Sequence, residues 1–412
     1  MTDRLPPVSL ARIRPAFFDV SIWLPILFAT VTFPLLQLSR NRAGEIDGSV
    51  SFAYAASIYL ALVCLSVIIV RHTRILKSFF KPSDLLLLLF FGVAVLQVFA
   101  IEKTSILLNI IVFIGAGFAI RALGYSERVR KSFVYSSLML CAFIVAAYVL
   151  KGPPVDRWLG GIHPNVFAAA CVAMVALSFF GPRWWSDLAL AIALVSALGV
   201  SSRYAIVTCI LLYVLLWSFN FRQIGPLRLF ALMALPCILV FDLLFNQANS
   251  ILGDALKLYD SSRGISSGLS GRDGHWSYFL PQFTERPLIG YGFRNRGAYY
   301  GAHNGFLDVF LQMGLLGGVS FFLFVLLRFK ELWREAQSSA PGAMKGRLFS
   351  ILTALVIGAQ LQPQFINFGD PFGIMVMICL FSRRRLEADM EASSAPLLAR
   401  KRPRLKLANL YF

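Results

Sequence analysis

Charged residues are scarce in this sequence. They make up 15% of the 412 residues, whereas soluble domains carry about 25%. Hydrophobic residues reach 58% and the mean hydropathy is +0.70, against about 45–50% hydrophobic residues in a typical soluble domain. A water-soluble core cannot bury that much apolar surface, but a lipid bilayer can accommodate it. The composition therefore excludes an ordinary soluble domain and predicts an integral membrane protein.

Cysteine and histidine are also few, with six and four residues. No Cys-x-x-Cys pair occurs, and every cysteine lies inside an apolar run, so we expect neither a disulfide nor a metal site. No Asp-rich metal-binding motif is present, and no cofactor is expected. The cysteines are Cys64, Cys141, Cys171, Cys209, Cys237 and Cys379.

Two further features are missing, an internal repeat and a recognisable signal-peptide cleavage site. The lack of a repeat argues against a transporter built from inverted repeats. The first apolar run is long, follows Arg4, Arg12 and Arg14, and contains no small-residue cleavage site. We therefore predict an uncleaved first helix.

Apolar runs of about 18 residues, the length that crosses a bilayer, recur along the chain. They predict an all-α polytopic membrane protein with about twelve transmembrane helices, forming a single domain over residues 1–412. The last two runs are short and are joined by the polar stretch 360–370, as in broken helices that line a polar cavity. The expected helices are 16–37, 50–70, 84–101, 104–120, 132–150, 163–180, 187–200, 203–219, 229–245, 304–327, 348–362 and 369–382.

The basic residues are unevenly distributed. A net charge of +18 would suit a nucleic-acid partner. However, 27 of the 39 Lys and Arg residues lie in the two terminal segments and in the connections on the same side of the membrane as these termini. The positive-inside rule makes that side cytoplasmic. The basic clusters are therefore interpreted mostly as topology signals, and no nucleic-acid partner is expected. These clusters are Arg71–Lys81, Arg121–Lys131, Arg328–Arg347 and Arg383–Arg385. The cytoplasmic tail 384–412 is predicted to contact anionic membrane lipids.

One connection, 246–302, is much longer than the others and falls on the outer side by this charge count. It is rich in aromatic residues, and long ordered loops are usually functional. We predict two short helices within it, at 254–260 and 273–283. The second is amphipathic and is expected to lie on the membrane surface.

Six motifs occur in a fixed order between residues 160 and 317. The first two are Gly-Gly-Ile-His-Pro-Asn (160–165) and Ser-Ser-Arg (201–203). The others are Gly-Arg-Asp-Gly-His-Trp (271–276), Arg-Pro-Leu-Ile-Gly-Tyr-Gly-Phe (286–293), His-Asn (303–304) and Gly-Leu-Leu-Gly (314–317). In the fourth motif, Gly290 and Gly292 are predicted to be turn residues. With this order and spacing, the sequence resembles the O-antigen ligase and polymerase superfamily of bacterial membrane glycosyltransferases.

The resemblance implies glycan transfer at the periplasmic face of the inner membrane. The donor would be a glycan linked to undecaprenyl diphosphate. The acceptor would be a sugar hydroxyl, on the lipid A core for a ligase or on another lipid-linked glycan for a polymerase. We favour the ligase, and the polymerase alternative stays open because both share the motifs. A lipid-linked saccharide transporter is less consistent with the missing repeat, and a non-enzymatic assembly protein has no positive support.

Three residues are predicted to be catalytic. Arg203 and Arg272 are expected to hold the donor diphosphate, because the guanidinium fork binds phosphate oxygens in pairs and stays charged. His303 is expected to take the proton of the acceptor hydroxyl, because imidazole titrates near neutral pH. The predicted enzyme is a metal-independent, inverting glycosyltransferase.

Six further residues are predicted to bind substrate, and each has a structural alternative. Helix capping would explain the His-Pro-Asn and His-Asn motifs. Loop packing would explain the tryptophan, and solvation would explain the two arginines. The predicted substrate-binding residues are Asn304, Trp276, His163, Asn165, Arg286 and Arg294.

Overall fold

The computed structural model describes residues 37–39, 82–123, 127–155, 157–218, 276–295, 298–299, 301–337, 344–360, 365–366 and 371–382. Within these ranges the protein consists of helices, turns and two isolated β-bridges, Val155–Trp158 and Leu159–Ile162, with no strand. The all-α prediction is confirmed for this part of the chain. The expected helices 16–37 (Gln37 apart), 50–70, 229–245 and 254–260, the tail 384–412, Cys64, Cys237 and Arg272 lie outside it.

Every long helix predicted within the described ranges is present, with ends shifted by five residues at most, except that α14 ends ten residues later than predicted. Three of them, α4, α6 and α14, are long and apolar enough to cross a membrane. The count of about twelve membrane spans stays a prediction. The long helices are α4 (Pro82–Ile101), α5 (Thr104–Leu123), α6 (Glu127–Lys151), α7 (Pro164–Ser178), α8 (Arg183–Gly199), α9 (Arg203–Ser218), α14 (Gly305–Gln337), α15 (Met344–Ala359) and α16 (Pro371–Phe381).

The helix of the long loop is displaced from its predicted position. It was expected at 273–283, whereas α13 spans Phe279–Glu285 and has no buried residue. Pro281 falls in its first turn, where the missing amide costs nothing. The helix ends just before Arg286 because the residue that precedes a proline, here Pro287, avoids the helical conformation.

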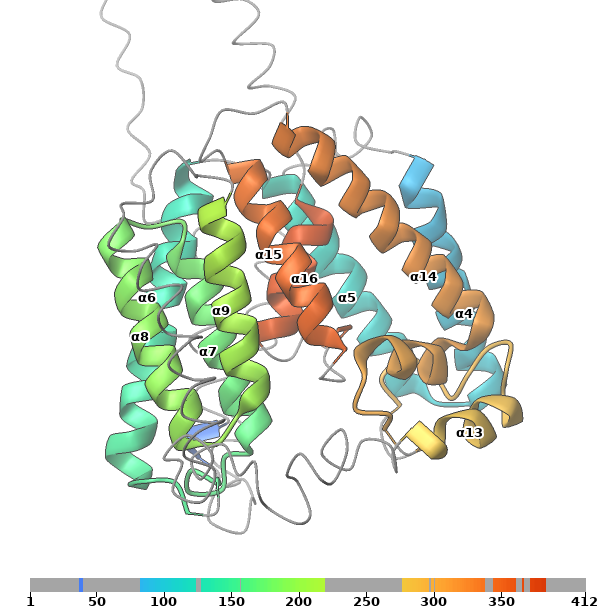
Figure 1. Ribbon diagram of the computed structural model, residues 1–412. Coiled ribbons are helices and arrows are strands. Elements are labelled where there is room, and N and C mark those ends of the chain that lie inside the picture. The colour runs from blue at the N-terminus through green and yellow to red at the C-terminus, as the bar shows by residue number, and fades with distance from the viewer. Residues whose placement is uncertain are drawn as a thin grey trace, which may run out of the picture.

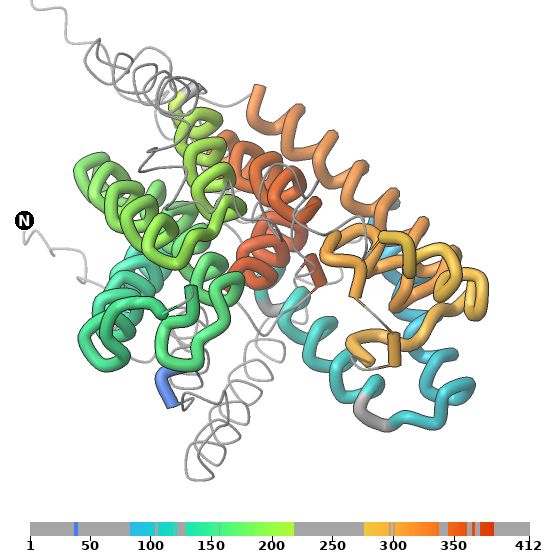
Figure 2. Tube along the Cα trace, turned by 60° about the horizontal axis from the view of Figure 1, so that its bottom comes forward, coloured from blue at the N-terminus to red at the C-terminus, as the bar shows by residue number. Residues whose placement is uncertain are grey.

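The long helices form two groups on either side of α15 and α16 (Figure 1). Helices α6, α7, α8 and α9 pack together on one side, and α4, α5 and α14 on the other. Helix α15 contacts α9 and α14, while α16 contacts α5 and α7, so this pair joins the groups. The view in Figure 2 shows the same division. Helix α7 is alanine-rich and almost entirely buried, because small side chains let neighbouring helices approach closely.

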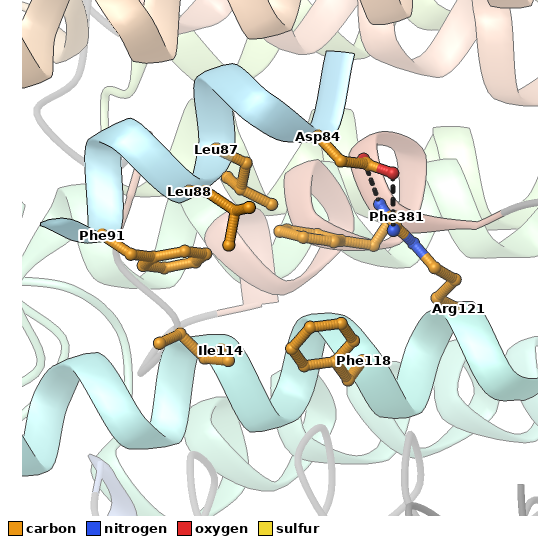
Figure 3. Close-up of a pocket in the computed structure, with 8 residues that line it drawn as sticks. All are labelled: Asp84, Leu87, Leu88, Phe91, Ile114, Phe118, Arg121 and Phe381. Carbon is orange, nitrogen blue, oxygen red and sulfur yellow. Dashed lines mark hydrogen bonds and ion pairs between the residues drawn. The ribbon is translucent and has the colours of Figure 1, made fainter. Parts of the chain in front are cut away.

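Two arginines assigned from the sequence to basic topology clusters are buried instead. Arg121 donates two hydrogen bonds to Asp84, at 2.9 and 2.7 Å, and is 3% exposed. Its guanidinium lies over the Phe381 ring, and the pair lines a small pocket whose other walls are apolar (Figure 3). Arg328 is fully buried and donates to the carbonyls of Cys379 and Ser382. These carbonyls end α16 and would otherwise lack partners.

The four described cysteines all lie in helices and carry free thiols. Cys171, Cys209 and Cys379 are buried, and Cys141 is half-buried.

Candidate active site

Helix α14 is broken at Gly314. This residue has φ 62° and ψ −168°, a conformation that essentially only glycine adopts. An unbroken helix would bond the amides of Leu315 and Leu316 to the carbonyls of Leu311 and Gln312. The break separates these four backbone groups, which then need other partners because buried amides and carbonyls are almost always paired.

The Pro-Leu-Ile-Gly-Tyr-Gly motif supplies all four partners. The Leu315 amide donates to the Pro287 carbonyl at 2.7 Å, and the Leu316 amide donates to the Leu288 carbonyl at 3.2 Å. In return, Tyr291 and Gly292 donate their amides to the carbonyls of Leu311 and Gln312, both at 2.9 Å. The motif therefore replaces a missing helical turn. We refer to residues 286–295 as the arginine turn and to residues 311–316 as the break.

The two backbones approach so closely that both contact positions require glycine. A Cβ atom at Gly290 would lie 2.5 Å from the Gly314 amide nitrogen. A Cβ atom at Gly314 would overlap the carbonyl group of Leu288. Both residues also have positive φ. The prediction that Gly290 is a turn residue is confirmed, and Gly314 is the position against which the turn packs.

Two buried glutamines hold the arginine turn against the break. The side chain of Gln97, on α4, donates to the carbonyls of Ile289 and Gln312 and accepts from the Phe293 amide at 2.9 Å. The side chain of Gln312 accepts from the Arg294 amide at 2.8 Å and donates to Asp308 at 2.8 Å. Together they tie α4, the turn and α14 into one hydrogen-bonded unit.

Arg286 is exposed, and its guanidinium lies 5.5 Å from the centre of the Tyr291 ring. The Tyr291 hydroxyl donates to Glu285 and lies 3.0 Å from the Gln282 carbonyl. Burial and the neighbouring Glu285 carboxylate raise the pKa of Tyr291 to about 12. The hydroxyl therefore keeps its proton, and its bond to Glu285, throughout the neutral range. The Arg286 guanidinium is therefore a surface cation that lies beside a tyrosine ring held by its own hydrogen bond.

His303 directly precedes the cap of α14. It is half-buried and has a φ of 49°, in the left-handed region. The Asn304 side chain accepts from the amides of Phe306 and Leu307, at 3.0 and 3.2 Å, which confirms the predicted cap. It also donates to Gln360, at the end of α15, at 3.1 Å. Asn304 thus fixes the backbone that carries His303, and its role as a sugar ligand stays a prediction.

Arg203 lies at the same end of the bundle as His303, across the end of α15. It is the first residue of α9. The next residue, Tyr204, has its ring against Gly358, which is two positions before Gln360. The last turn of α15 therefore touches the start of α9 through Tyr204 and the start of α14 through Asn304. In Figure 1 these helix ends lie at the lower side of the bundle.

The His-Pro-Asn motif begins α7. His163 caps the helix by accepting from the Asn165 amide at 3.1 Å, and its ring meets the Trp158 ring edge-on at 4.9 Å. Arg157 connects this region to the α8–α9 turn by donating to the carbonyls of Val200 and Ser201. The structure thus supports the capping role, and substrate binding by His163 and Asn165 stays a prediction.

Residues 188–322 match the family model described as O-antigen ligase. The match covers this segment of the chain, about a third of its 412 residues. The resemblance predicted from the motifs is thereby confirmed. A comparison with curated proteins finds no match to the chain. The family segment contains Arg203, the arginine turn, His303 and the break, but not α4, α15 or the His-Pro-Asn motif.

The described part of the matched segment holds two further predicted residues, Arg294 within the arginine turn and Trp276 ten residues before that turn begins. Arg294 is half-buried, with its amide held by Gln312. Trp276 is half-buried, and its indole nitrogen has no hydrogen-bond partner within the described part of the chain.

Sequence reasoning missed Gln97, Gln312, Arg157 and Gln360, although a signal existed for the first two. Each is a lone polar residue inside an apolar helical run. Polar residues are costly at such positions and usually have a partner there or a function. Gln97 lies outside the O-antigen ligase segment, so family resemblance does not point to it.

Proposed function

We propose that the protein is an O-antigen ligase that transfers a glycan from undecaprenyl diphosphate to a sugar hydroxyl of the lipid A core. The match of residues 188–322 to the ligase family model carries this proposal. The protein is proposed to lie in the inner membrane with both termini in the cytoplasm and with the site facing the periplasm. The reason is that most Lys and Arg residues lie at the helix ends on the other side of the membrane from the site, and such an excess marks the cytoplasmic side. The arrangement of His303 and Arg203 around the end of α15 supports a transfer site at that end.

The proposed step is a single displacement. The acceptor hydroxyl oxygen attacks the anomeric carbon of the donor sugar while its proton passes to His303. The bond from that carbon to the diphosphate oxygen breaks, and undecaprenyl diphosphate leaves. Attack from the face opposite the leaving group inverts the anomeric configuration. Arg203 and Arg272 offset the charge on the departing diphosphate, and Arg286 and Arg294 contact it or the adjoining sugars, with no metal required.

A polymerase that joins lipid-linked repeat units is the second candidate, because the Gly-Arg-x-x-x-Trp and Gly-Tyr-Gly-Phe sequences also suit exopolysaccharide polymerases. The glycans of a deletion strain distinguish the two. A missing ligase should leave lipopolysaccharide without polymer and cause polymer to accumulate on its lipid carrier. A missing polymerase should leave single repeat units. Unchanged glycans in every fraction would contradict both functions.

Arg203→Ala should reduce transfer about 100-fold, because loss of one fixed donor to a developing oxyanion typically costs that much. Arg203→Lys should recover only part of the activity, since an ammonium lacks the paired geometry of the guanidinium. The measurement is transfer from a purified lipid-linked donor. Arg334→Ala is the matched control, because it removes an exposed arginine near the opposite end of α14 and should leave transfer unchanged.

The same assay tests the proposed metal independence. EDTA should leave the rate of the unaltered protein unchanged. Loss of activity that magnesium restores would show that the diphosphate charge is neutralised by a cation and not by arginines alone.

A further inference from the structure

Gln97 is fully buried near the end of α4, in a helix of otherwise almost entirely apolar residues. Both atoms of its amide group are engaged. The nitrogen donates to the Ile289 carbonyl and, at 2.8 Å, to the Gln312 carbonyl. The oxygen accepts from the Phe293 amide at 2.9 Å. One side chain therefore holds the arginine turn at two points and the break at a third.

A second contact from the same end of α4 holds the far side of the turn. Lys103, two residues after the end of α4, donates to the Asn295 side chain at 2.6 Å. Asn295 in turn donates to the Tyr291 carbonyl at 2.8 Å. The turn between Arg286 and Arg294 is thus bound to α4 on both sides of Tyr291.

These bonds are specific to the turn and are not a general device for packing α4 on α14. At the opposite end of α4, the Ser83 hydroxyl lies 3.4 Å from the Glu331 carboxylate, and that contact joins only the two helices. Between the two ends the helices pack through apolar side chains such as Phe90, whose ring lies against Phe321. A leucine or methionine at position 97 would serve such packing without the cost of an amide in an apolar helix.

We propose that Gln97 is a positioning residue for glycan transfer. It fixes the backbone from which Arg286 and Arg294 reach the donor, and Lys103 supports it. This inference rests on the proposed function. On this inference, α4 sets the distance between the turn's cations and the donor diphosphate, although α4 lies outside the segment that matches the family model. An error of about 1 Å in such a placement can cost about 100-fold in rate.

The first test is steady-state transfer kinetics of Gln97→Met, which keeps the side-chain size and removes all three bonds. We expect kcat to fall 10- to 100-fold and the donor KM to rise, with the acceptor KM unchanged. A purely structural role would lower the amount of folded protein, and hence the apparent kcat, without changing the donor KM. Ser83→Ala is the matched control on the same helix pair and should retain both constants.

The second test reads the turn without using activity. Trypsin cleaves after Arg294 but not after Arg286, which precedes a proline. Cleavage after Arg294 should be faster in Gln97→Met than in the unaltered protein or in Ser83→Ala. Should Gln97→Met not fold, Lys103→Met, at an exposed position, should show the same changes in weaker form, and Lys103→Arg should restore the unaltered values.

Unchanged donor KM, kcat and cleavage rate in the folded Gln97→Met protein, or in Lys103→Met if Gln97→Met does not fold, would overturn the inference and leave the proposed function intact. Absence of transfer by the unaltered protein would overturn the proposed function itself. In that case the cleavage rates would still decide whether Gln97 holds the turn.

Discussion

Replacing His303 by glutamine should remove most glycan transfer while the protein remains folded. Glutamine can hydrogen-bond the acceptor hydroxyl but cannot take its proton. A general base typically contributes about 10²–10⁴-fold to a rate, and His303→Gln should lose close to that range. The residue is half-buried beside the Asn304 cap and is not part of the hydrophobic core. The measurement is turnover of a defined lipid-linked donor at several pH values.

The backbone at this position supplies the control. His303 has a positive φ, which asparagine tolerates better than most residues. His303→Asn should therefore keep the melting temperature of the unaltered protein and be as inactive as His303→Gln. The unaltered rate should fall at low pH as the imidazole becomes protonated, and the residual rate of the variants should lack that dependence. Near-normal turnover by His303→Gln would show that the histidine only positions the acceptor.

Gly314→Ala should prevent stable folding of the site end of α14. The residue adopts a backbone conformation that costs other residues about 1–3 kcal/mol. The new methyl group would also overlap the Leu288 carbonyl, and overpacking a dense contact costs about 1–3 kcal/mol more. The backbone cannot easily move aside, because the redirected hydrogen bonds hold it there. We expect a loss of at least about 3 kcal/mol, measured by thermal unfolding in detergent.

Gly92→Ala provides the comparison for this experiment. Gly92 lies in the middle of α4, and a Cβ atom there would meet nothing within 4 Å. Alanine is about 1 kcal/mol better than glycine inside a helix, so this variant should be as stable as the unaltered protein or more so. Equal melting temperatures for Gly314→Ala and Gly92→Ala would mean that α14 can form without its break.

The sequence predicted the features that depend on local patterns, above all the positions of the helices. Apolar runs located the helices from 82 to 218 and from 305 to 381. Asn304 was predicted to bind substrate, with capping as the alternative, and the structure shows the cap. The glycines of the turn were recognised by their composition. Their partner at Gly314 was not, because that contact depends on two segments meeting in space.

Long-range pairing explains the remaining misses. Gln97 lies about 190 residues before the turn that it binds, and no local pattern encodes that contact. Arg121 and Arg328 were counted as topology signals because a charge count treats every basic side chain as exposed. Their burial depends on Asp84 and on the end of α16, whose positions become evident only when the helices are assembled.

The break in α14 also constrains how the protein enters the membrane. Until residues 287–292 dock, four main-chain groups at the break have no partner, and each such group costs several kcal/mol in hydrocarbon. Their partners lie only 20 to 28 residues earlier in the chain, so the loop that must close is short and its entropic cost is small. We therefore expect the turn and α14 to insert as one preformed hairpin, which then docks on α4, a helix made far earlier in synthesis.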